Sequence, residues 1–228
     1  MRHPAPLVLA ALVGLSACAS PETLADDDDI LDGLNDGVTG AIAFAATDAY
    51  ASAQEALGMA QVPADARIAV ARVLGPQGSE SLASGTVAFV ETEGGVFIEY
   101  DVRGLEPGEH GLHVHEGMSC EPADLDDDGT PEPAGAAGGH FNPLDAPHGA
   151  PDDPRDERHA GDLGNVIVGD ARSAVGTATD DLLSFDGATS FVGRAMMVHS
   201  GRDDLVSQPS GDAGARVACG VIQLVRGE

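Results

Sequence analysis

The chain of 228 residues has no lysine and no tryptophan, and aromatic residues make up only 4% of it. Arginine therefore carries its positive charge, with 11 Lys+Arg positions against 38 Asp+Glu and a formal net charge of −27. Nucleic-acid binding requires Lys and Arg clustered at the phosphates, so this charge excludes that class of partner. With 30 glycines and few long helical patterns, the composition favours a small β fold with ordered loops.

The apolar run near the N-terminus is too short to cross a bilayer and has the form of a signal-peptide core. Arg2 precedes it, and two cleavage sites are open. "LSAC" resembles a bacterial lipobox that would make Cys18 the lipidated first residue, whereas "ACA" fits an ordinary A-x-A site. We prefer the lipobox because of where its cysteine falls, and Ser20 favours the outer membrane. We therefore expect a signal peptide over residues 1–17 and an exported, lipid-anchored protein of the periplasm or cell envelope.

The chain has only three cysteines, an odd number that needs an explanation in an exported protein. If Cys18 carries lipid, Cys120 and Cys219 remain as a pair, in a compartment where disulfides persist. The loop that they would close, of about 100 residues, is worth on the order of 4–5 kcal/mol in the chain-entropy model.

Residues 18–65 are predicted to be an acidic, Ala/Asp-rich tether. The run "DDDDILDGLNDG" is typical of solvated, flexible chain. Residues 46–60 could form a helix of about four turns, but its apolar face is mostly alanine, so we expect only marginal order there. The folded domain is expected over residues 66–228.

Short runs rich in β-branched residues begin near Arg67 and are separated by Gly, Pro and Ser. Strands at this spacing predict an all-β, antiparallel sandwich or barrel. Two long polar segments, 116–158 and 200–215, interrupt them, and loops of this length are usually functional. The strands are expected at 67–74, 85–92, 95–105, 111–116, 163–170, 174–185, 193–199 and 215–225.

The stretch "HGLHVHEG" holds three histidines within six residues. His113 and His115 are two apart and would point to the same face of a strand. Neutral imidazole is the commonest metal ligand on proteins, although one such pair could equally lie on an exposed polar face. The other histidines favour a metal centre, because they gather along the long loop and at the end of a late strand: His140, His148, His159 and His199.

Five stretches, in this order, resemble the copper,zinc superoxide dismutases: "HGLHVHEG", "GGHFNPLDAPHG", "DERHAGDLGN", "AMMVHSGRDDL" and "GDAGARVACGVI". The resemblance covers roughly residues 66–227. Cys120 follows soon after His115, as in the bacterial periplasmic, lipoprotein branch of that family. The resemblance implies a Greek-key β-sandwich or barrel with two long functional loops and a Cys120–Cys219 disulfide.

The resemblance also implies one copper and one zinc, bridged by His140 as an imidazolate. Four imidazoles suit Cu(II), and three imidazoles with a carboxylate suit a structural Zn(II). The implied copper ligands are His113, His115, His140 and His199, and the implied zinc ligands are His140, His148, His159 and Asp162.

Three further residues match the family beside the metals. Asp203 would hydrogen-bond one histidine of each metal and so fix the orientation of both rings. His110 would tie the neighbouring loop backbone without binding metal. Arg216, three residues before Cys219, would position a small anion, since guanidinium is an always-charged fork of donors; the alternative is a solvated surface arginine.

The expected function is thus dismutation of superoxide to O2 and hydrogen peroxide, with His140 and Arg216 as catalytic residues, protecting the cell envelope. The alternative is a module on the same fold that buffers or delivers copper and zinc without turnover. The anionic substrate would meet an anionic protein, so we expect weak electrostatic steering. The resemblance leaves open a homodimer.

A calcium site is a weaker hypothesis within the long loop. "DLDDDG" has the D-x-D-x-D-G start of a calcium loop, with Asp124, Asp126 and Asp128 as candidate ligands. The twelfth position is Gly135 in place of Glu, so a merely acidic loop is the preferred interpretation.

Overall fold

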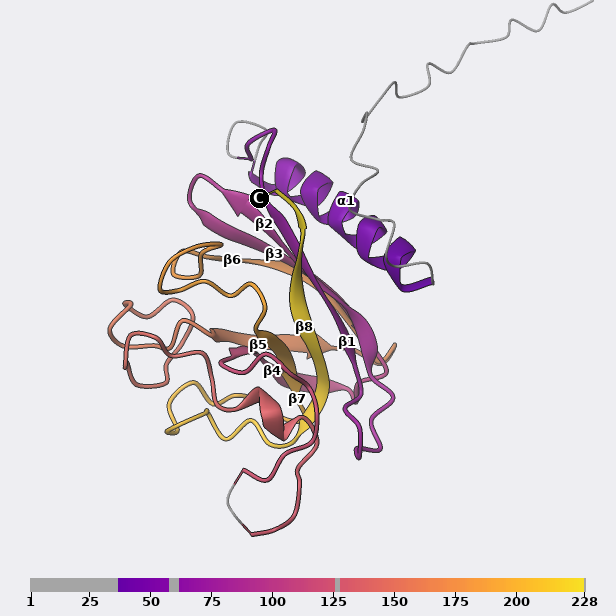
Figure 1. The fold of residues 1–228 in the computed structure, drawn as a ribbon, viewed down its shortest axis with the longest axis vertical. Coiled ribbons are helices and arrows are strands. Elements are labelled where there is room, and N and C mark those ends of the chain that lie inside the picture. The colour runs from indigo at the N-terminus through magenta and orange to yellow at the C-terminus, as the bar shows by residue number, and fades with distance from the viewer. Residues whose placement is uncertain (1–36, 58–61, 126–127, 228) are drawn as a thin grey trace, which may run out of the picture. The chain divides into compact units, whose positions relative to one another are not determined.

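The computed structural model describes residues 37–57, 62–125 and 128–227 (Figure 1). Its strands form one antiparallel sheet in the order β5-β4-β7-β8-β1-β2-β3-β6, and the two edge strands contact each other, so the sheet is a nearly closed barrel. The predicted all-β antiparallel class is confirmed. The strands are β1 Ile68–Leu74, β2 Ser84–Thr92, β3 Gly95–Arg103, β4 Gly108–His115, β5 Asp162–Val168, β6 Ser173–Asp180, β7 Ala195–His199 and β8 Arg216–Arg226.

Three pairings in the sheet join strands that are distant in sequence, among them that of β1 with β8. β3 pairs with β6, and β4 pairs with β7 as well as with β5. These pairings need connections that cross from one part of the barrel to another, as in a Greek key. The first loop (residues 116–161) joins β4 to β5, and the second loop (residues 200–215) joins β7 to β8. Both lie where the sequence predicts long loops.

The barrel interior is filled by inward-facing apolar side chains. Leu112 and Val114 of β4 belong to this core. Because side chains alternate along a strand, His113 and His115 point to the other face of the sheet, where loops cover them. The largest buried core side chains are Phe89, Ile98, Leu112, Phe191, Met196 and Ile222.

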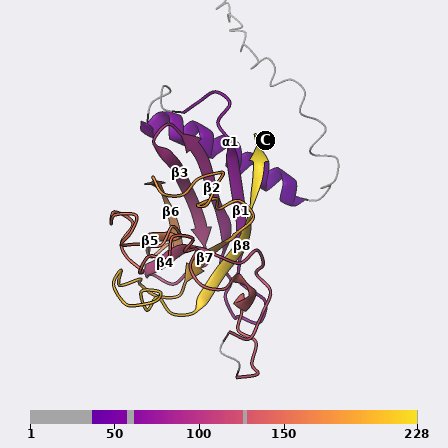
Figure 2. The ribbon, with the colours of Figure 1, turned by 60° about the vertical axis from the view of Figure 1, so that its left-hand side comes forward.

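Helix α1 (Gly37–Leu57) covers the outer face of the sheet (Figures 1 and 2). Ala46, Ala49 and Ala53 recur at helical spacing and are buried against Val70, Phe97 and other residues of β1–β3. Small alanines let the helix approach the sheet closely. The outer face of these strands is therefore a second hydrophobic cluster, separate from the barrel core.

This helix corrects the prediction of a largely flexible tether. Residues 37–57 of the predicted tether are helical and packed, and Val62 and Ala66 join the same cluster. Tyr50 also donates a hydrogen bond to the carbonyl oxygen of Pro63 at 3.1 Å. The predicted signal peptide, the lipobox cysteine Cys18 and the rest of the tether up to residue 36 lie outside the described residues. No helix among the described residues is long and apolar enough to span a membrane.

Candidate metal centre

Strand ends and the first loop bring the predicted ligands together. His113 and His115 lie on β4, and His199 ends the neighbouring strand β7. His140, in the first loop, forms an isolated antiparallel bridge with His115. Asp162 begins β5, paired with His113 in the sheet. The sheet register thus fixes ligands that are up to 86 positions apart in sequence, counted from His113 to His199.

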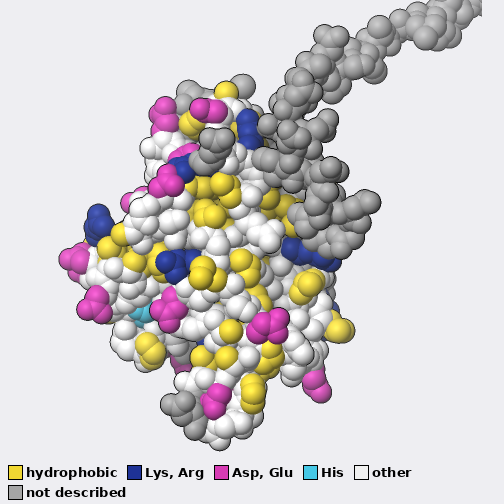
Figure 3. Space-filling view, viewed as in Figure 1, with side chains coloured by type: hydrophobic (Ala, Val, Ile, Leu, Met, Phe, Trp, Pro, Cys, Tyr) yellow, Lys and Arg dark blue, Asp and Glu magenta, His cyan; other side chains and the backbone are white. Residues whose placement is uncertain are grey.

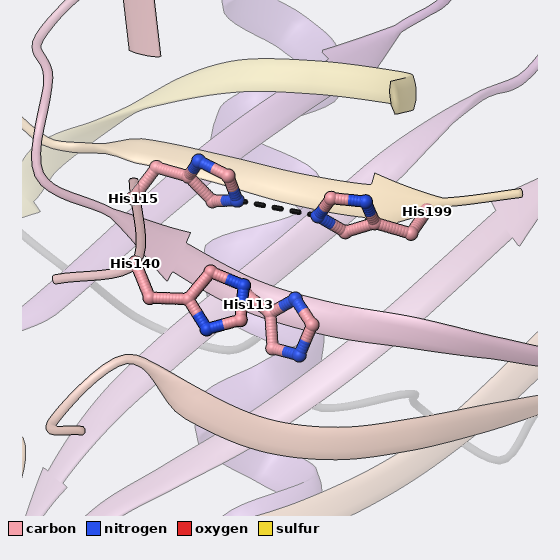
Figure 4. A group of neighbouring side chains, drawn as sticks. All are labelled: His113, His115, His140 and His199. Carbon is pink, nitrogen blue, oxygen red and sulfur yellow. Dashed lines mark hydrogen bonds between the residues drawn. The ribbon is translucent and has the colours of Figure 1, made fainter. Parts of the chain in front are cut away.

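The four-histidine group consists of His113, His115, His140 and His199 (Figure 4). All four side chains are buried, and their ligand atoms lie within 4.8 Å of one another. The rings of His113 and His140 are 3.9 Å apart between centroids, and Nε2 of His115 lies 3.3 Å from Nε2 of His199. Figure 3 shows little histidine surface on the face that it draws, in keeping with this burial.

The three-histidine–aspartate group consists of His140, His148, His159 and Asp162, and it is buried too. The Nδ1 atoms of the three histidines lie 2.8, 3.0 and 3.2 Å from Oδ1 of Asp162. The other oxygen of Asp162 accepts the backbone N–H groups of Gly149 and His159. One oxygen is thus fixed by the backbone while the other faces three imidazole nitrogens.

Buried nitrogens without hydrogen-bond partners mark both groups. Among the described residues, Nδ1 of His113, Nε2 of His140 and Nδ1 of His148 and His159 have none. The approaches of His148 and His159 to Asp162 are close but lack hydrogen-bond geometry. A buried polar atom without a partner costs about 1–3 kcal/mol, and a cation between these atoms removes that cost.

In His113, His115 and His199 the second ring nitrogen has a fixed acceptor, which sets the tautomer. Nδ1 of His115 donates to the carbonyl oxygen of Gly138 at 2.9 Å, and Nδ1 of His199 donates to that of Gly214 at 3.0 Å. Nε2 of His113 donates to Asp203 at 2.7 Å. Each ring then presents a lone pair on its other nitrogen, as a metal ligand must.

Asp203 connects the two groups. Its Oδ2 accepts from His113 and its Oδ1 accepts from Nε2 of His148 at 3.0 Å, and the carboxylate is fully buried. Burial opposes the charged form, but hydrogen bonds from both histidines and from the Leu205 N–H hold the pKa of Asp203 well below its usual range. Asp203 thus occupies the bridging position predicted for it.

The pKa values of three of the histidines also suit metal ligation. Burial lowers the pKa of His140 to about 4 and that of His199 to about 3, and it lowers the pKa of His115. These rings are therefore neutral at pH 7. Burial also lowers the pKa of His148, but the close Asp162 carboxylate and the hydrogen bond to Asp203 outweigh it and raise the pKa to about 9, so a metal bound there would displace a proton. Burial of Asp162 is likewise outweighed by its three histidines, which hold its pKa below the usual range.

Arg216 lies beside the four-histidine group and begins β8. Its Nη1 donates to the carbonyl oxygen of Ala134, and its Nη2 donates to that of Gly138, each at 2.5 Å. The Gly138 oxygen also accepts from His115, so one carbonyl joins the guanidinium to a ligand ring. Arg216 is half-buried, and this burial lowers its pKa. Two backbone carbonyl groups therefore hold the guanidinium beside the four-histidine group.

The disulfide and the supporting histidine are also where the sequence places them. Cys120 and Cys219 form a disulfide, which fastens the start of the first loop to β8. The two ring nitrogens of His110 contact the carbonyl oxygens of His199 and Glu106 at 2.7 and 2.8 Å. His110 belongs to neither metal-ligating group. It thus ties the backbone around the centre, as predicted.

The candidate calcium residues lie at an exposed part of the first loop. Asp124 and Asp128 approach each other together with Glu132, whereas Asp126 lies outside the described residues. Asp124 accepts the N–H of Gly129, and Glu132 accepts that of Leu125. The calcium hypothesis stays a prediction.

Sequence reasoning missed three side chains that support the centre. Arg158, next to His159, is only 1% exposed and pairs with Asp180 at 2.9 Å. Asn165 accepts from the backbone N–H of Asp203 and donates to its carbonyl oxygen. Gln208 likewise accepts from the backbone N–H of His148 and donates to its carbonyl oxygen. Their positions in the sequence carry no metal-ligand spacing, so only a folded structure shows them.

Comparisons with known proteins agree with this geometry. A family model described as copper/zinc superoxide dismutase matches residues 83–222. The chain is 45% identical over 147 residues to superoxide dismutase [Cu-Zn] 2 of Brassica juncea, covering 61% of this chain and 89% of that protein. A crystal structure of the clock protein EA4 matches with a TM-score of 0.58 and 33% identity, covering 73% of this chain and 100% of that one. With copper and zinc fitting its two buried ligand groups, the chain belongs to the copper/zinc superoxide dismutase family.

Proposed function

We propose that this protein converts superoxide to O2 and hydrogen peroxide at a copper–zinc pair bridged by His140. One observation carries the proposal: His140 belongs to both buried ligand groups. Its Nδ1 lies 2.8 Å from Asp162, and its Nε2 is buried without a partner. A module that only stored metals would not need one imidazole common to both groups.

The free ring nitrogens assign the ligands in this proposal. Copper would be held by the four-histidine group. Zinc would be held by the three-histidine–aspartate group, a closed set of four ligands that suits a structural ion. Copper supplies the one-electron oxidation and reduction that the reaction needs, and zinc has no redox chemistry.

Arg216 binds the substrate anion. A guanidinium has five N–H donors in a fixed fork, and the hydrogen bonds to Ala134 and Gly138 orient this one while leaving donors free. The Gly138 oxygen also accepts a hydrogen bond from the ring of His115. It therefore sets the position of the bound anion relative to this copper ligand.

His140 moves the proton. Its Nε2 would take up a proton from solvent and give it to the reduced oxygen, and a second solvent proton completes hydrogen peroxide. Burial of the ring fixes the position of this nitrogen, so the proton is delivered from one oriented atom.

The test is superoxide disproportionation by the protein with its helix α1, loaded with copper and zinc. We expect Arg216→Ala to lower kcat/KM by about 100-fold, the lower end for loss of an oriented anion-stabilising donor, and His140→Ala to lower it further. Arg103→Ala is the matched control, because Arg103 is exposed on β3. Tight binding of both metals with negligible turnover would establish the buffering module in place of the enzyme.

We also propose that the protein is of the bacterial periplasmic, lipoprotein type and protects the cell envelope. Two features support this: the leader with its lipobox at Cys18, and a disulfide that persists in oxidising compartments. Cys18→Ser is expected to move the protein from the membrane fraction to the soluble fraction. The same location in both forms would overturn the anchor, and light scattering of the soluble form distinguishes a monomer from a homodimer.

A further inference from the structure

We propose that Gln208, on the second loop, is the positioning residue that holds the zinc ligand His148 in place. This inference rests on the zinc assignment of His148 proposed above. The Oε1 atom of Gln208 accepts the backbone N–H of His148 at 2.9 Å. Its Nε2 atom donates to the backbone carbonyl oxygen of His148 at 2.8 Å. One carboxamide thus satisfies both backbone polar groups of the same ligand.

The second loop also holds the side chain of His148. Asp203 accepts from ring Nε2 at 3.0 Å, and Nδ1 is the one polar atom of His148 that lacks a hydrogen-bond partner. Two contacts therefore fix the backbone, a third fixes the ring, and the atom that remains faces Asp162 at 3.0 Å. All three contacts come from residues 203–208.

The second loop is itself built to present these groups. Asp204 accepts the backbone N–H groups of Val206 and Ser207 and the hydroxyl of Ser207, which closes the turn before Gln208. Gly211 (φ 67°) lies directly over the Asp203–His148 contact, and a Cβ there would collide with both side chains. The turn and the glycine bring the carboxamide and the carboxylate to one histidine.

The consequence is a coupling between the two loops. His148 is held in its ligating position from the second loop, which continues to the substrate-binding Arg216 at its far end. Release of zinc and opening of the second loop therefore favour each other, and by linkage each must affect the other equally. Outer contacts of this kind typically change metal affinity by about 10–100-fold.

The test is Gln208→Met in the fully metal-loaded protein, because methionine keeps the length of the side chain and removes both hydrogen bonds. Gln223→Met is the matched control, since Gln223 is an exposed glutamine on β8. We expect zinc release to a chromogenic chelator to be roughly 10-fold faster in Gln208→Met than in the control. We also expect faster hydrogen exchange of the His148 amide.

A spectroscopic measurement separates positioning from general stability. With Co(II) in the zinc site, the visible absorption bands should differ between Gln208→Met and the control, because the ligand field follows the orientation of His148. Equal release rates and equal spectra would overturn the role of Gln208. A wild-type protein that binds neither zinc nor Co(II) stoichiometrically would instead overturn the zinc assignment on which the inference rests.

Discussion

The buried histidine groups beside the first loop and the acidic group on that loop differ in almost every physical respect. The histidine groups are buried, and several of their nitrogens face one another without hydrogen-bond partners. The acidic group of Asp124, Asp128 and Glu132 is largely exposed, and each carboxylate already accepts a backbone N–H group. Burial with unsatisfied donor atoms indicates a metal centre, whereas clustered charge alone indicates a hydrated loop.

Removal of both metals should give the largest effect. Structural zinc sites contribute on the order of 10 kcal/mol to folding, and a protein of this size loses about 2–4 °C in Tm for each kcal/mol. We therefore expect Tm to fall by at least about 20 °C after chelation, and to recover when copper and zinc return. Equal melting curves for the metal-loaded and the chelated protein would mean that the histidine groups do not stabilise the fold by binding metal.

The pH dependence of the metal-free protein should be smaller but specific. Between pH 6.5 and 4 the unfolded chain protonates His140 and His199, whose folded pKa values are about 4 and about 3, so stability falls as pH falls. Above pH 6.5, His148 keeps its proton only in the folded state, up to its pKa of about 9, so stability falls as pH rises. The free energy of unfolding, measured by urea denaturation, should be largest near pH 6.5 and should be smaller by an amount on the order of 2 kcal/mol at pH 5.

The control is the same pH series on the double variant Asp124→Asn/Asp128→Asn. This variant should show the same maximum and the same slope, because the effect comes from the buried histidines. A shifted maximum would assign part of the pH dependence to the exposed acidic group.

Removal of one acidic charge should change turnover by about twofold. Glu132 is close enough to Arg216 to raise its pKa by Coulomb attraction, although burial dominates. Glu132→Gln should therefore raise kcat/KM at low ionic strength, and the gain should fade above 0.1 M salt, where the Debye length is about 10 Å. Asp101→Asn, on β3, makes the same change in net charge and serves as control.

The salt dependence of turnover by the wild-type protein tests the same electrostatic effect. With a net charge of −27, we expect rising ionic strength not to slow its turnover. A clear decrease with salt would mean that local positive charge at Arg216 dominates over the acidic surface.

Calcium should give the smallest effect. The exposed carboxylates already accept backbone N–H groups, so we expect Tm to be the same in calcium and in a calcium chelator. Stabilisation by calcium that disappears in Asp124→Asn/Asp128→Asn would establish the calcium site.

The sequence predicts the barrel and the ligand groups well, for a physical reason. Strand alternation places His113 and His115 on one face, and the order of the five motifs identifies the remaining ligands without any knowledge of distances. The Cys120–Cys219 pairing is confirmed as well. These features depend on residue type and spacing, which are visible before folding.

The packing of helix α1 could not be predicted from its own residues, because alanine gives a weak apolar face and the sequence indicated only a marginally ordered helix over residues 46–60. The signal lies in the strands that it covers. Ile68–Ala71 on β1 and Val87–Val90 on β2 are buried at every position, whereas a sheet covered on one side alternates. Continuous apolar runs of this kind indicate that both faces are covered. Gln208 gave no comparable signal, since a carboxamide that clamps a backbone follows no sequence pattern.

The Gly138 carbonyl oxygen constrains how this protein can be varied by evolution or by design. It accepts from His115 and from Arg216, and its residue has a φ of 69°, a backbone conformation that residues with a Cβ rarely adopt. Any change that tilts this peptide moves His115 and Arg216, the proposed copper ligand and the proposed anion-binding residue, together. Substitutions around residue 138 should therefore change metal retention and substrate preference at the same time. Variants that change only one of the two properties have to be sought elsewhere in the chain.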